Sequence, residues 1–105
     1  MEKLVINGHV AVLISPSYGA GWYTWNNAKE GSEALLFHPE LVNLVEENRA
    51  SLITQELVEK LTGVKDVYVG NPEDLVIVWV KKGTTFDVLE YDGAESLLTD
   101  LPIKA

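Results

Sequence analysis

Hydrophobic residues cluster or alternate along the chain in stretches that predict β-strands. Residues 4–6 and 9–14 are rich in valine and isoleucine, and the Asn7-Gly8 pair between them is typical of a two-residue hairpin. One continuous strand with a bulge at Gly8 is the alternative. Residues 75–80 (LVIVWV) contain no polar side chain. This run predicts a strand covered on both faces, by helices on one side and by another sheet or a subunit on the other.

The last third of the chain continues the strand-and-turn pattern. Residues 81–84 (KKGT) predict a turn, and the alternating residues 85–91 (TFDVLEY) predict a half-exposed partner strand. Asp92-Gly93 predicts a further turn, followed by a short strand near residues 95–98. Two shorter apolar runs also favour strands, at residues 34–37 and 67–69.

Two segments have the spacing of amphipathic helices. The first begins at His38-Pro39, because proline fits the first helical position, and it carries an apolar stripe within residues 41–45. The second begins after Ser51 or Thr54 and ends at Gly63. The pattern therefore predicts one α+β domain over residues 1–105, with a mainly antiparallel β-sheet and two α-helices packed on one face.

Composition agrees with one folded domain. The chain has 105 residues, of which 47% are hydrophobic and 23% charged, and this is enough for a single modest core. It contains no cysteine, which excludes disulfides and cysteine-based zinc or redox chemistry. No apolar run approaches the roughly 20 residues of a membrane span, and the N-terminus lacks the apolar core of a signal peptide. We therefore expect a cytoplasmic protein without a membrane partner.

The charge balance narrows the choice of partners. The formal net charge is −8 and the chain has one arginine, Arg49, so binding to nucleic acid is disfavoured. A phosphate ligand would need local lysines, Arg49 or backbone amides to offset the negative field. An acidic surface is usually a solubility device, and less often it imitates nucleic acid and blocks a basic groove of another protein.

The leading candidate for a binding site is the stretch of residues 15–26, SPSYGAGWYTWN. It combines four aromatic residues with two glycines and several uncharged hydrogen-bonding side chains. Tryptophan rings stack on bases, glycine lets a backbone approach a ligand closely, and arginine binds phosphate in a bidentate fashion. The alternative is a turn whose tryptophans both face the core. The candidate ligand-binding residues are Ser17, Gly19, Gly21, Trp22, Thr24, Trp25 and Arg49.

Other constellations point to no chemistry. Glu90, Asp92 and Glu95 are three carboxylates around one turn, but their spacing is not that of a calcium loop, and an exposed hairpin turn explains them as well. His9 and His38 lack metal-ligand spacing. The chain has neither a Walker loop, nor a dinucleotide fingerprint, nor a G-x-S-x-G nucleophile motif. We therefore expect no catalytic residue, no metal and no cofactor.

Three segments carry a resemblance to known proteins: ISPSYGAGWYTWN, FHPELVNLVEEN and GNPEDLVIVWVKKGTTFDVLEYDGAES. In this order they resemble small bacteriophage and prophage proteins with a C-terminal EYDG-x-E segment, here residues 90–95. The chain is also similar to the first Thoeris anti-defence family, whose members sequester the cyclic ADP-ribose isomers that bacterial TIR enzymes make. That resemblance implies binding without catalysis, homo-oligomers built by joined sheets, and ligand pockets shared between two subunits.

The expected function is accordingly a phage-encoded, non-enzymatic binder of a cyclic nucleotide messenger. A pyrophosphate ligand favours arginines, and this chain departs from that by offering only Arg49. The rival expectation, based on the charge of −8, is an acidic inhibitor of a host protein surface. A virion or accessory protein is the third.

Overall fold

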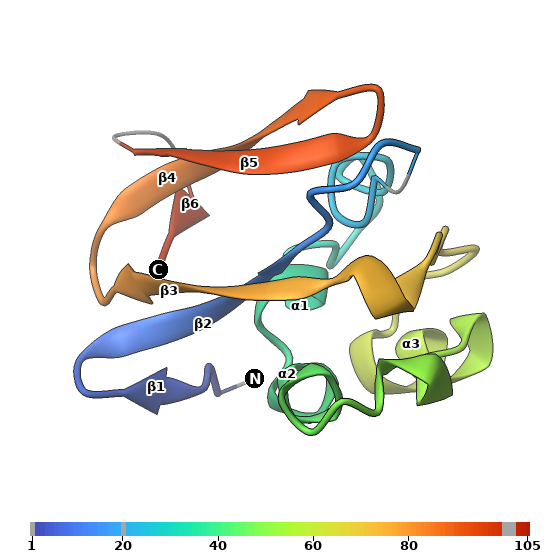
Figure 1. Ribbon diagram of the computed structural model, residues 1–105, viewed down its shortest axis with the longest axis horizontal. Helices are drawn as coiled ribbons and strands as arrows, with labels where there is room; N and C mark the ends of the chain where they lie inside the picture. The colour runs from blue at the N-terminus through green and yellow to red at the C-terminus, as the bar shows by residue number, and fades with distance from the viewer. Residues whose placement is uncertain (1, 20, 100–102) are drawn as a thin grey trace.

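The computed structural model describes residues 2–19, 21–99 and 103–105, and it confirms the predicted antiparallel α+β architecture (Figure 1). The strands divide between two three-stranded antiparallel sheets. The first has the order β1-β2-β3, formed by β1 (Val5–Ile6), β2 (His9–Ile14) and β3 (Val76–Lys81). The second has the order β5-β4-β6, formed by β4 (Thr85–Tyr91), β5 (Ala94–Thr99) and β6 (Ile103–Lys104).

Both predicted two-residue hairpins are present. Asn7 and Gly8 have φ angles of 52° and 75°, and Asp92 and Gly93 have φ angles of 49° and 86°. Positive φ at both central residues is the type I′ pattern that matches the twist of antiparallel strands. β1 pairs with β2 and β4 pairs with β5 directly across these turns, so the alternative of one continuous strand through Gly8 is wrong.

Both predicted helices begin at a predicted residue, and the second also ends at the predicted Gly63. In α2 (Pro39–Glu46) the backbone N–H of Glu40 donates to Nδ1 of His38. In α3 (Gln55–Thr62) Thr54 accepts a hydrogen bond from the backbone of Leu57, and Gly63 ends the helix with a φ of 77°. One 3₁₀ turn, η1 (Ala50–Leu52), lies between α2 and α3, and a second, η2 (Pro72–Asp74), precedes β3.

Residues 34–37 form a helix, α1 (Ala34–Phe37), so the strand predicted there is wrong. Backbone N–H groups of residues 34, 35 and 36 each donate to the carbonyl three residues earlier, which coils the chain before α1 begins. A short apolar run that is buried all round fits a helix as well as a strand. Residues 67–69 also form no strand; they have no regular secondary structure, and the Asn26 side chain holds Tyr68 among them.

The turn after β3 moves the chain from one sheet to the other. β3 pairs with β2, with Val78 opposite Val12, whereas residues 85–91 pair with β5 and β6. The prediction that residues 85–91 partner residues 75–80 is therefore wrong. β3 is an edge strand on which Val76 and Trp79 are each 39% exposed, so this chain alone does not cover both of its faces.

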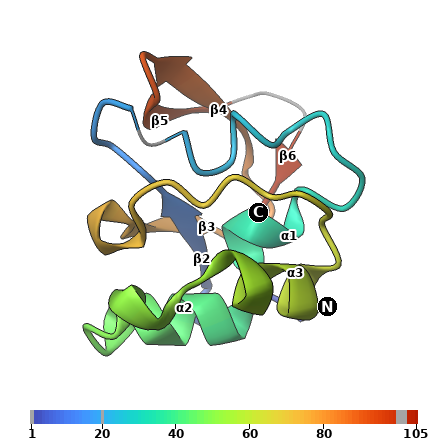
Figure 2. The ribbon, with the colours of Figure 1, turned by 90° about the vertical axis from the view of Figure 1, so that its right-hand side faces the viewer.

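The core lies between the two sheets and the helices. Residues 10–14 of β2 are all buried, and α1 and α2 pack against this strand. Phe37 of α1 meets Phe86 of β4 edge to face, with ring centroids 6.2 Å apart. Figure 2 shows α2 and α3 at the lower end of the molecule, α1 in its middle and the β4–β5 hairpin at the upper end. None of the helices described is long and apolar enough to cross a membrane.

Candidate functional site

The glycine- and aromatic-rich segment is a loop that lies against the β4–β5 turn. The described residues of this segment form successive turns and no strand. The backbone N–H groups of Gly19 and Gly21 donate to the carbonyl oxygens of Asp92 and Gly93, the latter at 2.8 Å. These two amides therefore hold the loop on the hairpin, and neither points at a ligand as the sequence had suggested.

A buried carboxylate fixes the shape of this loop from below. Glu95 on β5 is 3% exposed, and its Oε2 accepts hydrogen bonds from the backbone N–H of Tyr23 at 2.8 Å and of Thr24 at 2.7 Å. The Thr24 hydroxyl also donates to Oε2, at 2.9 Å. Oε1 accepts from the backbone N–H and the hydroxyl of Ser15, at 3.0 Å and 3.3 Å. One carboxylate thus takes up five donors from two parts of the loop.

The two tryptophans of the loop have different roles. Trp22 is fully buried and its Nε1–H donates to the carbonyl of Leu35 at 2.9 Å, so its ring offers no face to a ligand. The prediction that Trp22 stacks on a base is therefore wrong, because the turns of the loop direct its ring into the core. The Thr24 hydroxyl is committed to Glu95, and Ser17 is half-buried at the outer part of the loop.

Trp25, in contrast, is 43% exposed. Its ring lies directly against Gly21, where an added Cβ would fall 2.1 Å from Cδ2 of Trp25. On its other side Trp25 approaches Tyr68, with ring centroids 5.0 Å apart and planes at 44°. The Tyr68 hydroxyl donates to the carbonyl of Gly19 at 3.1 Å, which ties this second ring to the same loop. Trp25 and Tyr68 together form an exposed aromatic pair.

Asn26 and Lys29 brace the loop to the segment that carries Tyr68. The buried Asn26 side chain donates to the carbonyl of Tyr68 at 2.7 Å and accepts from its N–H at 2.9 Å, as a neighbouring strand would. The Lys29 ammonium donates to Oδ1 of the same Asn26 at 3.0 Å and also to the carbonyl of Asp66. The aromatic pair therefore stands on two cross-linked segments, residues 24–31 and 62–68.

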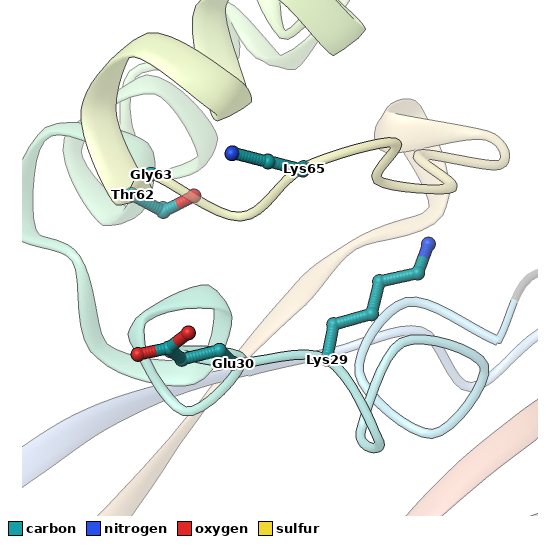
Figure 3. Close-up of a pocket in the computed structure, with 6 residues that line it drawn as sticks. Lys29, Glu30, Thr62, Gly63 and Lys65 are labelled. Atoms are coloured by element: carbon teal, nitrogen blue, oxygen red, sulfur yellow. The ribbon is translucent and has the colours of Figure 1, made fainter.

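The same two segments also line an open hollow of about 600 Å³. Figure 3 shows Lys29 and Glu30 on one wall, and Thr62 and Lys65 on the other. Two ammonium groups at one hollow form a setting for a phosphate, with the Glu30 carboxylate as the opposing charge. Its volume lies within the range of small-molecule sites.

Comparison with known proteins adds no relative. No family model matches this chain, and neither a curated protein nor a solved structure matches it. The function is therefore inferred from the site and its chemistry, together with the sequence resemblance.

Arg49 does not belong to this site. It follows the C-terminal end of α2 and pairs with Glu47 at 3.5 Å, both side chains being more than half exposed. Figures 1 and 2 place α2 at the lower end of the molecule, whereas the β4–β5 hairpin that holds the aromatic loop lies at the upper end. Of the predicted ligand residues, the structure groups Ser17, Gly19, Gly21, Trp22, Thr24 and Trp25 in one loop and separates Arg49 from them.

The three carboxylates of the β4–β5 turn do not converge. Glu90 accepts a hydrogen bond from the N–H of Gly93 at 2.6 Å, whereas Glu95 is buried beneath the loop. The described part of the chain contains no group of three acidic or histidine side chains able to hold a metal ion.

Burial raises the pKa of the Tyr23 phenol, and the negative charges of Glu33, Asp87 and Glu95 act in the same direction.

Sequence reasoning missed three residues of the site. Tyr68 and Lys65 lie some 40 residues after the loop, and nothing in the sequence pattern relates them to it. Glu95 was noted as a metal candidate, although its place on the inward face of β5 makes it an acceptor for the loop. A second exposed pair, Tyr18 and Tyr91, meets edge to face at 6.2 Å on the hairpin side of the loop.

Proposed function

We propose that this protein is a non-enzymatic binder that sequesters a nucleotide second messenger of the cyclic ADP-ribose type. In this proposal it is encoded by a phage, acts in the cytoplasm of the bacterial host and counters TIR-based immunity. The observation that carries the proposal is the exposed aromatic pair of Trp25 and Tyr68, which stands on the same two cross-linked segments that line a hollow with two lysines. An exposed ring accepts a base, and nearby ammonium groups accept phosphates.

The architecture of the site suits binding more than catalysis. Its polar groups are mostly committed to holding the loop: the amides of Gly19 and Gly21 to the hairpin, and the Thr24 hydroxyl to Glu95. A site built in advance binds with a smaller entropic cost, because few groups must be ordered when the ligand arrives. Cyclic ADP-ribose isomers combine an adenine with a pyrophosphate, and the resemblance of the loop motif to the Thoeris anti-defence family favours this class.

The edge strand β3 supports the proposal of a homo-oligomer. Its outward edge has no backbone partner among the residues described, and its side chains are almost all apolar. Glu73 and Asp74 precede the strand, and Lys81 and Lys82 end it. Antiparallel pairing of two copies of β3 about Val78 would set the acidic end of each strand opposite the basic end of the other. Such opposite charges across a strand pair are stabilising.

The binding proposal is tested by calorimetry and native mass spectrometry with cyclic ADP-ribose isomers and a panel of cyclic mononucleotides. Replacing Trp25 by Ala should cost about 1–3 kcal/mol of binding free energy, or roughly 5- to 150-fold in affinity. Lys65→Ala should weaken every ligand of this panel, because each carries phosphate, and it should leave the binding of adenosine, which carries none, unchanged. Arg49→Ala is the matched control, and it should leave the affinity unchanged because the residue lies far from the site.

Two results would contradict this function. If every nucleotide fails to bind to the folded protein, the aromatic pair is not a base platform, and the acidic-inhibitor hypothesis takes its place. If the ligand released after heating has a changed mass, the protein is an enzyme. Sedimentation tests the oligomer separately: Lys81→Glu with Lys82→Glu should dissociate it, and adding Glu73→Lys with Asp74→Lys should restore it. A wild-type protein that sediments as a monomer would refute the pairing through β3.

A further inference from the structure

A second surface of the molecule has a distinct character, on the opposite side from the aromatic loop. A groove of about 410 Å³ runs between α2 on one side and η1 and α3 on the other. Leu52 of η1 stands 49% exposed beside it. Four leucines from α2, η1 and α3 line the groove, and none of them is fully buried: Leu44, Leu52, Leu57 and Leu61.

The helical spacing explains how the groove acquires an apolar floor and an acidic rim. Glu40 and Leu44 of α2 and its C-cap residue Glu47 recur at the spacing of one helix face, so two carboxylates flank a leucine. Along α3, Leu57 and Leu61 are four residues apart and line the same hollow. Single exposed leucines on a protein surface need no explanation, but several that meet in one rimmed hollow mark an interaction site.

The charge around the groove is predominantly negative. Residues 39–62 contain five glutamates against Arg49 and Lys60. One of the two cations, Arg49, is paired with Glu47 at the end of the rim. A partner that places positive charge along this rim would therefore be favoured, and a negative one excluded.

We propose that this groove binds a short basic amphipathic helix of a protein partner. Apolar side chains at positions i, i+3 or i+4, and i+7 of that helix would enter the leucine floor, and its lysines or arginines would meet Glu40 and Glu47. α2 has eight residues and so spans about 12 Å, which matches roughly two turns of a bound helix. This contact is small, and its affinity is in the micromolar range. The proposal does not depend on the nucleotide site.

A second copy of this chain fits the groove poorly. The helical face that it would offer is this same leucine and glutamate surface, so the carboxylates of Glu40 and Glu47 would meet their own equivalents. Like charges brought together at an interface oppose association. The occupant is therefore a positively charged helix from another protein.

The test uses full-length protein and three synthetic peptides of about 16 residues, long enough to form a helix. The first has leucines at i, i+3, i+4 and i+7 and lysines elsewhere. The second keeps this composition but scrambles the leucine spacing, and the third replaces every lysine by glutamate. Titration calorimetry measures affinity, and backbone amide shifts in NMR locate the bound peptide. We expect the first peptide alone to bind, with shifts confined to α2, η1 and α3.

Variants of the protein distinguish binding in the groove from general attraction of a basic peptide to an acidic protein. Leu52→Ser, at an exposed position, and Glu47→Lys should each weaken the first peptide about tenfold, the size expected for a central contact. Glu33→Lys makes the same change in net charge at an exposed residue outside the groove, and it should alter the affinity less than twofold. Circular dichroism confirms that each variant is folded.

Several outcomes would overturn the proposal. They are equal affinity for the scrambled peptide, equal weakening by Glu33→Lys and Glu47→Lys, or amide shifts that map to the aromatic loop. A protein that sediments as a dimer and becomes monomeric on Leu52→Ser would show instead that a second copy occupies the groove.

Discussion

Replacing Glu95 by Gln gives the sharpest test of how the aromatic loop is held. The change keeps the size of the side chain but removes its charge and turns one acceptor oxygen into an NH₂ donor. The Ser15 hydroxyl can rotate to accept from this NH₂, so the amide will place its NH₂ toward Ser15. Its remaining oxygen then stays with the N–H groups of Tyr23 and Thr24, which lie at 2.8 Å and 2.7 Å in the native protein.

The magnitude follows from what this rearrangement loses. The backbone N–H of Ser15, now 3.0 Å from Oε1, would face the NH₂ group and lose its acceptor in a buried position. An unsatisfied buried donor costs about 1–3 kcal/mol, and the contacts to Tyr23 and Thr24 also lose their charge assistance. We therefore expect a loss of about 2–4 kcal/mol in unfolding free energy. For a domain of this size that is a decrease of roughly 10–25 °C in Tm.

Urea unfolding followed by tryptophan fluorescence measures this loss, and Glu90→Gln is the matched control. Glu90 faces Glu95 across the β4–β5 pair, but it is exposed and holds one backbone N–H, that of Gly93. It should cost no more than about 1 kcal/mol. The explanation fails if Glu95→Gln unfolds within about 0.5 kcal/mol of the wild type, or if the two variants are equally destabilised.

Three further predictions concern the loop and its surroundings. Gly21→Ala, at a φ of 30° and with its Cβ against the Trp25 ring, should displace that ring and shift tryptophan fluorescence to longer wavelength; an unchanged spectrum would contradict the packing. Because burial raises the pKa of Tyr23, its phenol should ionise at a higher pH than a free tyrosine side chain. Above pH 10 the folded state keeps this proton while the unfolded state loses it, so the contribution of Tyr23 to the unfolding free energy is intact below pH 10 and decreases above it. Absorbance at 295 nm measures the ionisation, and urea midpoints measure the stability, with Tyr23→Phe as reference. Arg49→Ala should change unfolding free energy by less than about 1 kcal/mol, because its pair with Glu47 is exposed; a larger loss would give this pair a structural role.

Local chemistry made the turns and caps of this chain predictable. Asn7-Gly8 and Asp92-Gly93 adopt the positive φ angles that this type of turn requires, and few other residue pairs accept them. Thr54 and Gly63 mark the ends of α3 because a hydroxyl and a left-handed glycine satisfy the unpaired helix groups there. Each of these signals acts within a few residues, so a single sequence is enough to find it.

What the sequence could not reveal depends on contacts between distant residues. The strand predicted at residues 67–69 is replaced by a segment held through the Asn26 side chain, across 42 positions. Trp22 and Trp25 differ in burial because Glu95 curls the loop, which no spacing rule within residues 15–26 contains. The turn after Lys81 leads into the second sheet because Gly83 and Thr84 bond to Ala105. Long-range partners thus decided which residues share a surface.

The contacts around each charge, and not the total charge, reconcile an acidic chain with the proposed phosphate ligand. A net charge of −8 suggests repulsion, yet at physiological ionic strength charges more than about 8 Å away are largely screened. A phosphate bound in the hollow, as proposed, would therefore be governed by the two lysines and Glu30 that line it. Lys29 is oriented by neutral oxygens, those of Asn26 and the Asp66 carbonyl, and not by a carboxylate that would cancel its charge. In the described part of the chain the one salt bridge is Arg49 with Glu47, on the far side of the molecule. The chain thus uses its single arginine in an exposed ion pair and leaves lysine charge, held by neutral groups, at the hollow between residues 29–31 and 62–65.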